Sequence, residues 1–252
     1  MNKYQLFFSS FKEFVIQIKL SKLDDLCGIK DSEISSFEAT YNIKIPKSVI
    51  SFFQIMGKKM NIRNNQYGIF TISEFIKGME VSNKLNLYKY INKSENSNKY
   101  VYFSIDRIQE DYIYFFDSQE ENPKVFLQWD LMDDEDYQDC YGKNPPPRKV
   151  DCIGSFITLF REFLYQLIFI ELEYSKDECQ DRLFADLDKI EWTKYYQNLF
   201  KDNVIESHAF RKYRKRFYEI IELIEEKEDK ILTIDEFEWA FIDYLKEKGY
   251  TV

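Results

Sequence analysis

Three short segments rich in aromatic and β-branched residues follow one another near the middle of the chain, and they constrain the fold more than any other feature. They are Tyr100–Ile105, Tyr112–Asp117 and Lys124–Trp129, and polar turn residues bound each of them. This composition is typical of β-strands. Because successive segments begin about a dozen residues apart, they predict an antiparallel meander.

A helix with clear bounds precedes these strands. Pro46 opens it, where the missing N–H costs nothing in a first helical turn, and Gly57 falls just past its end. Two further helices are predicted upstream from apolar residues at helical spacing: one at residues 3–20, and one that follows an N-cap at Asp31 or Ser32 and runs to about Tyr41. The buried face of the Pro46 helix is predicted to consist of Val49, Phe52, Phe53 and Met56.

The connecting segments give weaker signals. Tyr67–Ile72 is β-rich, and Ser73 is placed to cap a short helix after it, while Asn83–Tyr90 favours another helix. Residues 130–151 contain an acidic run and three consecutive prolines, and we expect them to be irregular. A helix with a wide apolar face is expected to start near Ser155.

The composition changes at about Ser175. From there to the C-terminus helical periodicity dominates, strand signals vanish and charged residues become frequent. The expected architecture is therefore α+β, with a small antiparallel sheet packed with helices in residues 1–174. An all-helical C-terminal extension is expected in residues 175–252.

The net charge argues for a protein partner and against nucleic acid. The 252 residues carry a formal net charge of −9, with a pI near 4.9. Nucleic-acid binders usually present a basic surface, whereas an acidic chain is soluble and associates quickly with a basic partner. The one basic cluster, at residues 211–216, is followed closely by glutamates and is expected to be a solvated helix face.

The cysteines and the most apolar window give no sign of secretion or membrane insertion. Cys27, Cys140, Cys152 and Cys179 are scattered and form no CxxC pair. The apolar window at residues 156–172 contains three charged side chains and a glutamine, which is too polar for a membrane span. We therefore expect a cytoplasmic protein that does not bind membranes; the sequence does not define its oligomeric state.

Motifs for catalysis and cofactor binding are lacking in the sequence. His208 is the only histidine, and no nucleophile elbow accompanies it, so a His-dependent nucleophilic mechanism is disfavoured. One histidine and four dispersed cysteines do not make a zinc site. Neither a P-loop nor a dinucleotide-binding glycine motif occurs. We expect no enzyme activity, no cofactor and no metal.

The strongest local feature is a run of carboxylates after the third strand. So many charges cannot be buried without partners, which leaves a solvated loop, a surface facing a basic protein, or a metal site. The run lacks the spacing of an EF-hand loop. Its members are Asp130, Asp133, Asp134, Glu135, Asp136 and Asp139.

Aromatic side chains near this run are candidate anchors for a partner. Alternation along the second strand puts Tyr112, Tyr114 and Phe116 on one face of the sheet. Core packing accounts for at least one face, but an exposed aromatic row beside the acidic run would suit a binding hot spot. Tyr114 and Trp129 are the residues that we predict for this role.

The segment from Ile34 to Gly57 reads IxxFExxYNIKIPKSVISFFQIMG. It resembles the N-terminal motif of the SUKH superfamily, the fold of the yeast cell-wall-assembly regulator and of many bacterial immunity proteins. The matching positions are Phe37, Glu38, Pro46, Phe52, Phe53 and Gly57. The resemblance extends over residues 20–170, but the helical extension is not part of the typical domain.

The resemblance implies a non-enzymatic binding role. Most bacterial members of the superfamily look like immunity proteins, which neutralise a cognate polymorphic toxin of nuclease or deaminase type. We expect the sheet and the acidic run to occlude the cleft of a basic toxin domain, with the six carboxylates, Tyr114 and Trp129 in contact. Two alternatives stay open. One is a regulatory protein-interaction scaffold, and the other is a metal-dependent hydrolase that uses the acidic run.

Overall fold

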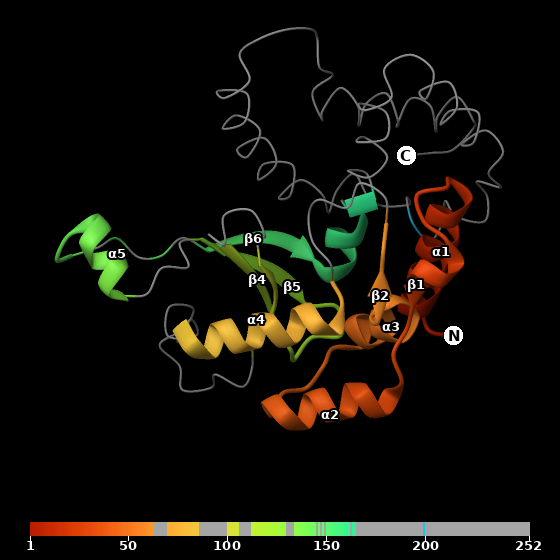
Figure 1. Cartoon of the computed structure of the whole chain (residues 1–252), viewed down its shortest axis with the longest axis horizontal. Helices are drawn as coiled ribbons and strands as arrows, with labels where there is room; N and C mark the ends of the chain where they lie inside the picture. Colours follow the sequence, from red (N-terminus) through yellow and green to blue (C-terminus); the bar gives the residue numbers. More distant parts are fainter. Residues whose placement is uncertain are drawn as a thin grey trace, which may run out of the picture.

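The fold in the computed structural model is α+β, as expected (Figure 1). The residues that the structure describes are 1–62, 70–85, 100–105, 112–129, 134–144, 146, 148, 150–161, 163–164 and 199. The helices are α1 (Lys3–Gln17), α2 (Asp31–Tyr41), α3 (Lys47–Met56), α4 (Ile72–Leu85) and α5 (Asp134–Tyr141), with a 3₁₀ turn η1 (Leu23–Asp25). The strands are β1 (Leu26–Cys27), β2 (Lys59–Met60), β3 (Tyr100–Ile105), β4 (Tyr112–Asp117), β5 (Lys124–Trp129) and β6 (Val150–Ser155). Residues 156–161 are also helical.

The main sheet is an antiparallel meander in the order β3-β4-β5-β6. The three predicted strands are confirmed with the bounds that their turns indicated. One rung of the ladder crosses all four strands, because Tyr102 pairs with Phe115, Phe115 with Phe126, and Phe126 with Cys152. The fourth strand was not predicted, since residues 130–151 were expected to be irregular. That expectation is wrong for α5 and for the first residues of β6.

Helix α3 ends where the sequence indicates, but its N-terminus is completed by a distant turn. Pro46 is the N-cap residue and offers no side-chain acceptor. The backbone N–H of Ser48 donates instead to the carbonyl oxygen of Glu121, 2.9 Å away, in the turn between β4 and β5. At the other end, the N–H of Gly57 donates to the carbonyl of Phe53. The β4–β5 turn is thereby fixed against the start of α3.

An aromatic core joins α1, α3 and the 156–161 helix to the sheet. Phe160 lies at its centre, with ring centroids 5.0 Å from Phe8 and 4.7 Å from Phe52. Phe156 packs at 5.9 Å from Phe116 and so connects this helix to β4. These rings meet at tilted and edge-to-face angles, which is the favourable geometry for aromatic pairs. Leu199 is buried in the same core.

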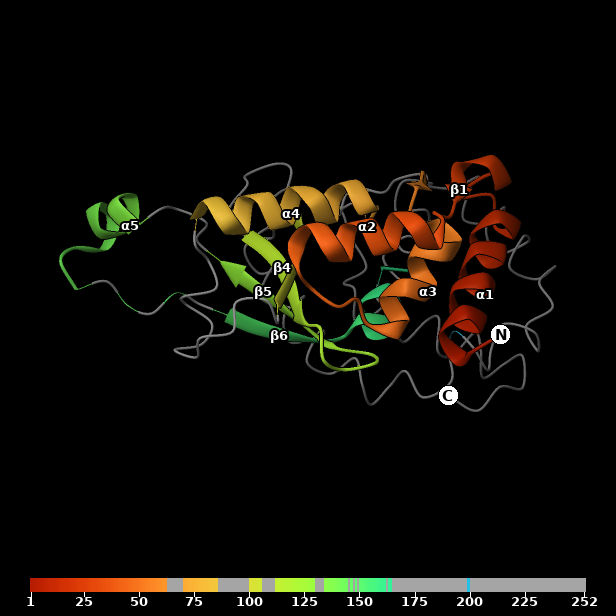
Figure 2. The ribbon, with the colours of Figure 1, turned by 90° about the horizontal axis from the view of Figure 1, so that it is seen from below.

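Helices α2 and α4 lie side by side next to the sheet (Figure 2). The rings of Phe37 in α2 and Phe75 in α4 are 6.5 Å apart, and Phe75 stacks on Phe103 of β3 at 4.8 Å. Both views place α5 beyond the far end of the sheet, away from α1 and α3. Within the described ranges, no helix has the length and apolar character to cross a bilayer. The predicted extension at 175–252 lies outside the described residues, apart from Leu199.

Candidate functional site

The part of the acidic run from Asp134 onwards forms a helix where a loop was expected. Asp134, Glu135 and Asp136 occupy the first turn of α5. Negative charge in a first turn is favoured by the helix dipole and by the free N–H groups there. Part of the acidic composition is therefore explained by the stability of the helix itself, independently of any partner.

Helix α5 is two-sided. At about 100° per residue, Tyr137 and Tyr141 project to one side and Glu135 and Asp139 to the opposite side. Tyr137 is only 5% exposed: its hydroxyl donates to the carbonyl of Pro146 at 3.2 Å, and the guanidinium of Arg148 lies 4.3 Å from its ring centre. Tyr137 thus packs on the chain that follows α5, whereas Tyr141, Glu135 and Asp139 are exposed.

The predicted contact residues are only partly brought together. Glu135, Asp136 and Asp139 are exposed on α5. Tyr114 lies on β4, half-buried, with its ring stacked on Phe103 at a centroid distance of 5.9 Å. Phe116, which shares its face, is fully buried, so this face belongs to the core rather than to an exposed aromatic row.

The other predicted residues cannot be placed in the site. Asp130 and Asp133 lie outside the described residues, as do the side chains of Asp134 and Trp129. Within the part of the chain that the structure describes, no three His, Cys, Asp or Glu side chains are grouped to hold a metal ion.

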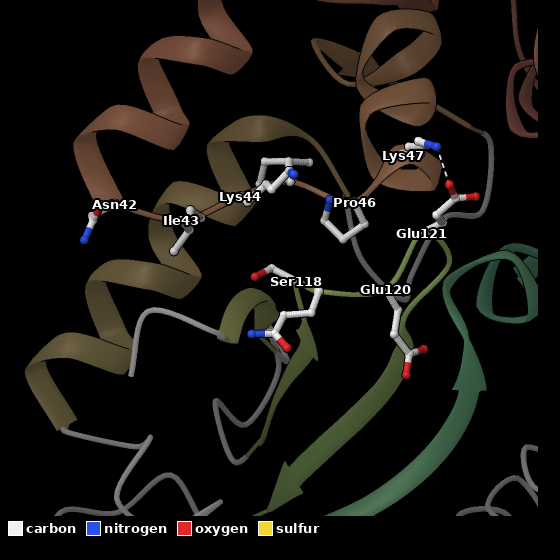
Figure 3. A pocket seen from close by; sticks show the side chains of 10 residues that line it. Asn42, Ile43, Lys44, Pro46, Lys47, Ser118, Glu120 and Glu121 are labelled. Atoms are coloured by element: carbon white, nitrogen blue, oxygen red, sulfur yellow. Dashed lines mark hydrogen bonds and ion pairs between the residues drawn. The ribbon is translucent and has the colours of Figure 1, made fainter. Parts of the chain in front are cut away.

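A groove that sequence reasoning missed lies between the α2–α3 connection and the β4–β5 turn (Figure 3). Its volume is about 760 Å³. One wall is residues 42–47 and the other is residues 118–121. Ile43, Ile45 and Pro46 are buried and supply its apolar surface, whereas Asn42, Lys44, Gln119 and Glu120 are exposed. The groove therefore combines an apolar wall with a polar rim, as ligand sites commonly do.

The local sequence explains how the first wall is held. Asn42 ends α2 in the left-handed conformation, with φ of 49°, which asparagine tolerates better than most residues. The chain then runs extended to Pro46, whose preceding residue avoids the helical region. Glu38 fixes this extended piece, because its carbonyl accepts from the N–H of Ile43 at 3.1 Å and its carboxylate from the N–H of Ile45 at 2.7 Å.

An ion pair links the two walls. The ammonium of Lys47 binds the carboxylate of Glu121 across the groove (Figure 3). This hydrogen bond and the attraction of opposite charges hold the pKa of Glu121 below its ordinary 4.5 and raise the pKa of Lys47 above 10.5. Because both side chains are largely exposed, solvent screens the pair and it positions the turn more than it stabilises the fold.

The one sequence signal for the groove was the Ile43–Pro46 segment, which could be recognised as extended. The opposite wall comes from residues more than 70 positions later, and it is joined to the first wall by the hydrogen bond from Ser48 to Glu121 and by the Lys47–Glu121 ion pair. No pattern among neighbouring residues of the sequence indicates such a contact between distant segments.

Comparison with known proteins identifies one family. Residues 28–144 match the model of the SMI1 / KNR4 family (SUKH-1). No curated protein and no solved structure matches the chain. The matched segment begins just after β1 and ends just after α5, so it contains both the groove and the acidic helix. Helix α1, strand β6 and the 156–161 helix lie outside it, although their side chains complete the core.

Proposed function

Because the chain belongs to the SUKH superfamily through its residues 28–144, we propose that it is a non-enzymatic binding protein that neutralises a cognate polymorphic toxin by covering its active cleft. The family supports a protein partner. The observation that carries the choice of surface is that Glu135, Asp136 and Asp139 are all exposed on α5, a helix held by the packing of Tyr137 on Arg148.

A basic toxin domain is the partner that this surface fits. Nuclease and deaminase domains act on polyanions and so carry positive charge around their clefts. An acidic helix at the far end of the sheet would attract such a cleft and compete with its substrate. The overall charge of −9 acts in the same direction at longer range. No bond has to be made or broken, since occupation of the cleft is sufficient.

Further contacts in the proposed interface are Asp130, Asp133, Asp134, Tyr114 and Trp129. The first three belong to the same acidic run in the sequence, between the end of β5 and the first turn of α5. Tyr114 is the weakest member of this set, because its ring is half-buried against Phe103. The interface therefore rests on α5 and the residues before it.

The test is calorimetric titration of the full chain with the toxin domain encoded beside its gene. The variant Asp133→Asn/Asp134→Asn/Glu135→Gln/Asp136→Asn should bind about tenfold more weakly or worse, mainly through slower association and with less dependence on salt. Unchanged affinity would reject α5 as the contact surface.

A matched pair of variants separates the site from the general charge. Glu135→Gln/Asp139→Asn removes two carboxylates from α5, and Asp24→Asn/Glu80→Gln removes two exposed carboxylates elsewhere. Both change the net charge equally, so the proposal requires the first to weaken binding clearly more than the second. If the adjacent gene encodes no secreted toxin, a regulatory scaffold that uses the same surface becomes the better proposal.

A further inference from the structure

One edge of the extended segment Ile43–Pro46 has backbone groups that make no hydrogen bond within the described part of the chain. In an extended chain, the N–H and C=O groups of successive residues point to opposite sides. Ile43 and Ile45 donate to Glu38 on one side. The N–H and C=O of Lys44 therefore point to the other side, and no described residue makes a hydrogen bond to either group.

The opposite wall offers a hydroxyl. Ser118 is 7% exposed, and its side chain lines the groove without a hydrogen-bond partner in the described part of the chain. Figure 3 shows it facing the Ile43–Pro46 segment across the open space. Its oxygen is not sealed from solvent, so water satisfies it in the free protein, and a ligand that fills the groove can replace that water.

Charge decides the class of ligand. Lys47 and Glu121 neutralise each other, and the remaining charges on the rim are one positive Lys44 and one negative Glu120. The groove as a whole is neutral, and Ile43, Ile45 and Pro46 give it an apolar wall. It thus suits an uncharged ligand that offers both a donor and an acceptor to Lys44, and the backbone of an extended peptide does this.

We propose that the groove binds an extended, uncharged peptide segment of the partner protein, which pairs with the backbone of Lys44 and hydrogen-bonds to Ser118. Four residues in strand geometry span about 13 Å, the length of the Ile43–Pro46 wall. The volume of about 760 Å³ accommodates a ligand of that size. This inference rests on the proposed function only in that the partner is a protein; the groove and α5 are separate contacts.

The experiment uses a phage-displayed library of random linear ten-residue peptides selected on the full chain. Enriched peptides are synthesised, and their affinities are measured against variants. Lys44→Pro removes the N–H and keeps an extended backbone, so it should weaken binding tenfold or more. Lys44→Ala keeps the N–H and removes only the charge, so affinity should stay within about twofold. Circular dichroism establishes that each variant is folded.

Ser118→Ala gives a second variant that does not alter the backbone. It should weaken binding about fivefold, whereas Ser32→Ala, at an exposed position on α2, should have no effect. A library that yields no peptide sensitive to both Lys44→Pro and Ser118→Ala overturns the proposal. If Lys44→Ala weakens peptide binding as much as Lys44→Pro does, the proposal is also overturned, because the Lys44 charge and not its backbone would then bind the peptide.

The α5 variant Glu135→Gln/Asp139→Asn separates this inference from the proposed function. It should leave peptide affinity unchanged. If peptides bind the groove but the toxin domain does not bind the protein, only the toxin proposal is contradicted. If the toxin domain binds through α5 but the library yields no peptide that binds the groove, only the peptide proposal is contradicted.

Discussion

Gly78 in the middle of α4 lies directly against the backbone of Tyr102 in β3. A Cβ atom at position 78 would come within 2.7 Å of the Tyr102 carbonyl oxygen and 2.8 Å of the Phe103 Cα. Next to this contact, the N–H of Tyr102 lies 3.3 Å from the sulfur of Met79. Since β3 is the first strand of the sheet, α4 covers an edge that would otherwise be open to pairing with another chain.

Replacement of Gly78 by alanine should therefore destabilise the protein. Alanine gains about 1 kcal/mol over glycine in a helix interior, but forcing a methyl group into backbone at this distance costs more, and we expect a net loss of about 1–2 kcal/mol. Urea unfolding measures the difference. Asn83→Ala, at an exposed position of the same helix, should be neutral or slightly stabilising. A stabilised Gly78→Ala would mean that α4 does not approach β3 this closely.

Phe160 provides a test of the aromatic core. Its ring lies between those of Phe8 on α1 and Phe52 on α3, and it is fully buried. Truncation to alanine should cost about 3–5 kcal/mol, while Phe160→Leu should cost about half of that. A thermal melt of each variant is sufficient. If truncation had no effect, α1 and the 156–161 helix, both outside the family match, would not be part of the folded unit.

The elements that the sequence predicted well are those with local signals at both ends. Strands β3 to β5 are closed by polar turns, and α3 is bounded by Pro46 and Gly57. Helix α2 ends at Tyr41 as predicted, where Asn42 adopts the left-handed conformation, and it begins at Asp31, one or two residues before the predicted start. In each case the physical cause lies within a few residues of the element.

The elements that were missed depend on distant contacts. Strand β6 contains Asp151 and Gly154 and has no alternating pattern; its place comes from pairing with β5. A short helix capped by Ser73 was predicted, but α4 runs from Ile72 to Leu85 and passes through Gly78, whose lack of a side chain lets it pack against β3. Helix α5 lacks an apolar face of its own, and the ring of Tyr137 packs instead on Arg148.

The same distinction applies to the candidate sites. Charge and composition were sufficient to single out the acidic residues of α5. The groove needs Ser118 and Lys44 on opposite walls, and nothing in the sequence around either residue indicates the other. The sequence therefore indicates a candidate surface made of consecutive residues, but not one made of two segments that are distant in the chain.

The ion pair between Lys47 and Glu121 predicts a pH dependence of the β4–β5 turn. The pKa of Glu121 is lowered, so its contribution is complete above the ordinary value of 4.5 and is lost as the pH falls through the folded-state pKa. The pKa of Lys47 is raised, so its contribution is complete below 10.5 and is lost as the pH rises through the higher folded value. The pair should be intact between about pH 5 and pH 10.

Carbon-detected NMR titration of the Glu121 carboxyl measures this directly. Its pKa should lie below 4.5 in the wild type and return towards 4.5 in Lys47→Met. The global melting temperature should hardly change, because the pair is exposed. Lys58→Met, at an exposed position away from the groove, should leave the Glu121 pKa where it is. If the Glu121 pKa were the same in Lys47→Met as in the wild type, the ion pair between the two walls would not exist in solution.

Tyr137 is predicted to control the order of α5 without controlling the fold. Its ring carries the contacts to Arg148 and Tyr141, and its hydroxyl binds the Pro146 carbonyl. A helix of eight residues is too short to be stable alone in water, so α5 depends on these contacts. In Tyr137→Ala, amide exchange in residues 134–141 should accelerate at least tenfold, while exchange in β4 and β5 stays unchanged.

Gln138→Ala is the matched control for Tyr137→Ala, because Gln138 is exposed on the same helix and alanine favours helix formation. It should leave exchange in α5 unchanged or slower. Toxin affinity should then fall in Tyr137→Ala although every carboxylate is present, since the acidic side would no longer be held in one conformation and binding would have to order it. Full affinity in Tyr137→Ala, together with fast exchange in α5, would mean that the carboxylates act as a flexible charged segment and that the helix is not what the partner recognises.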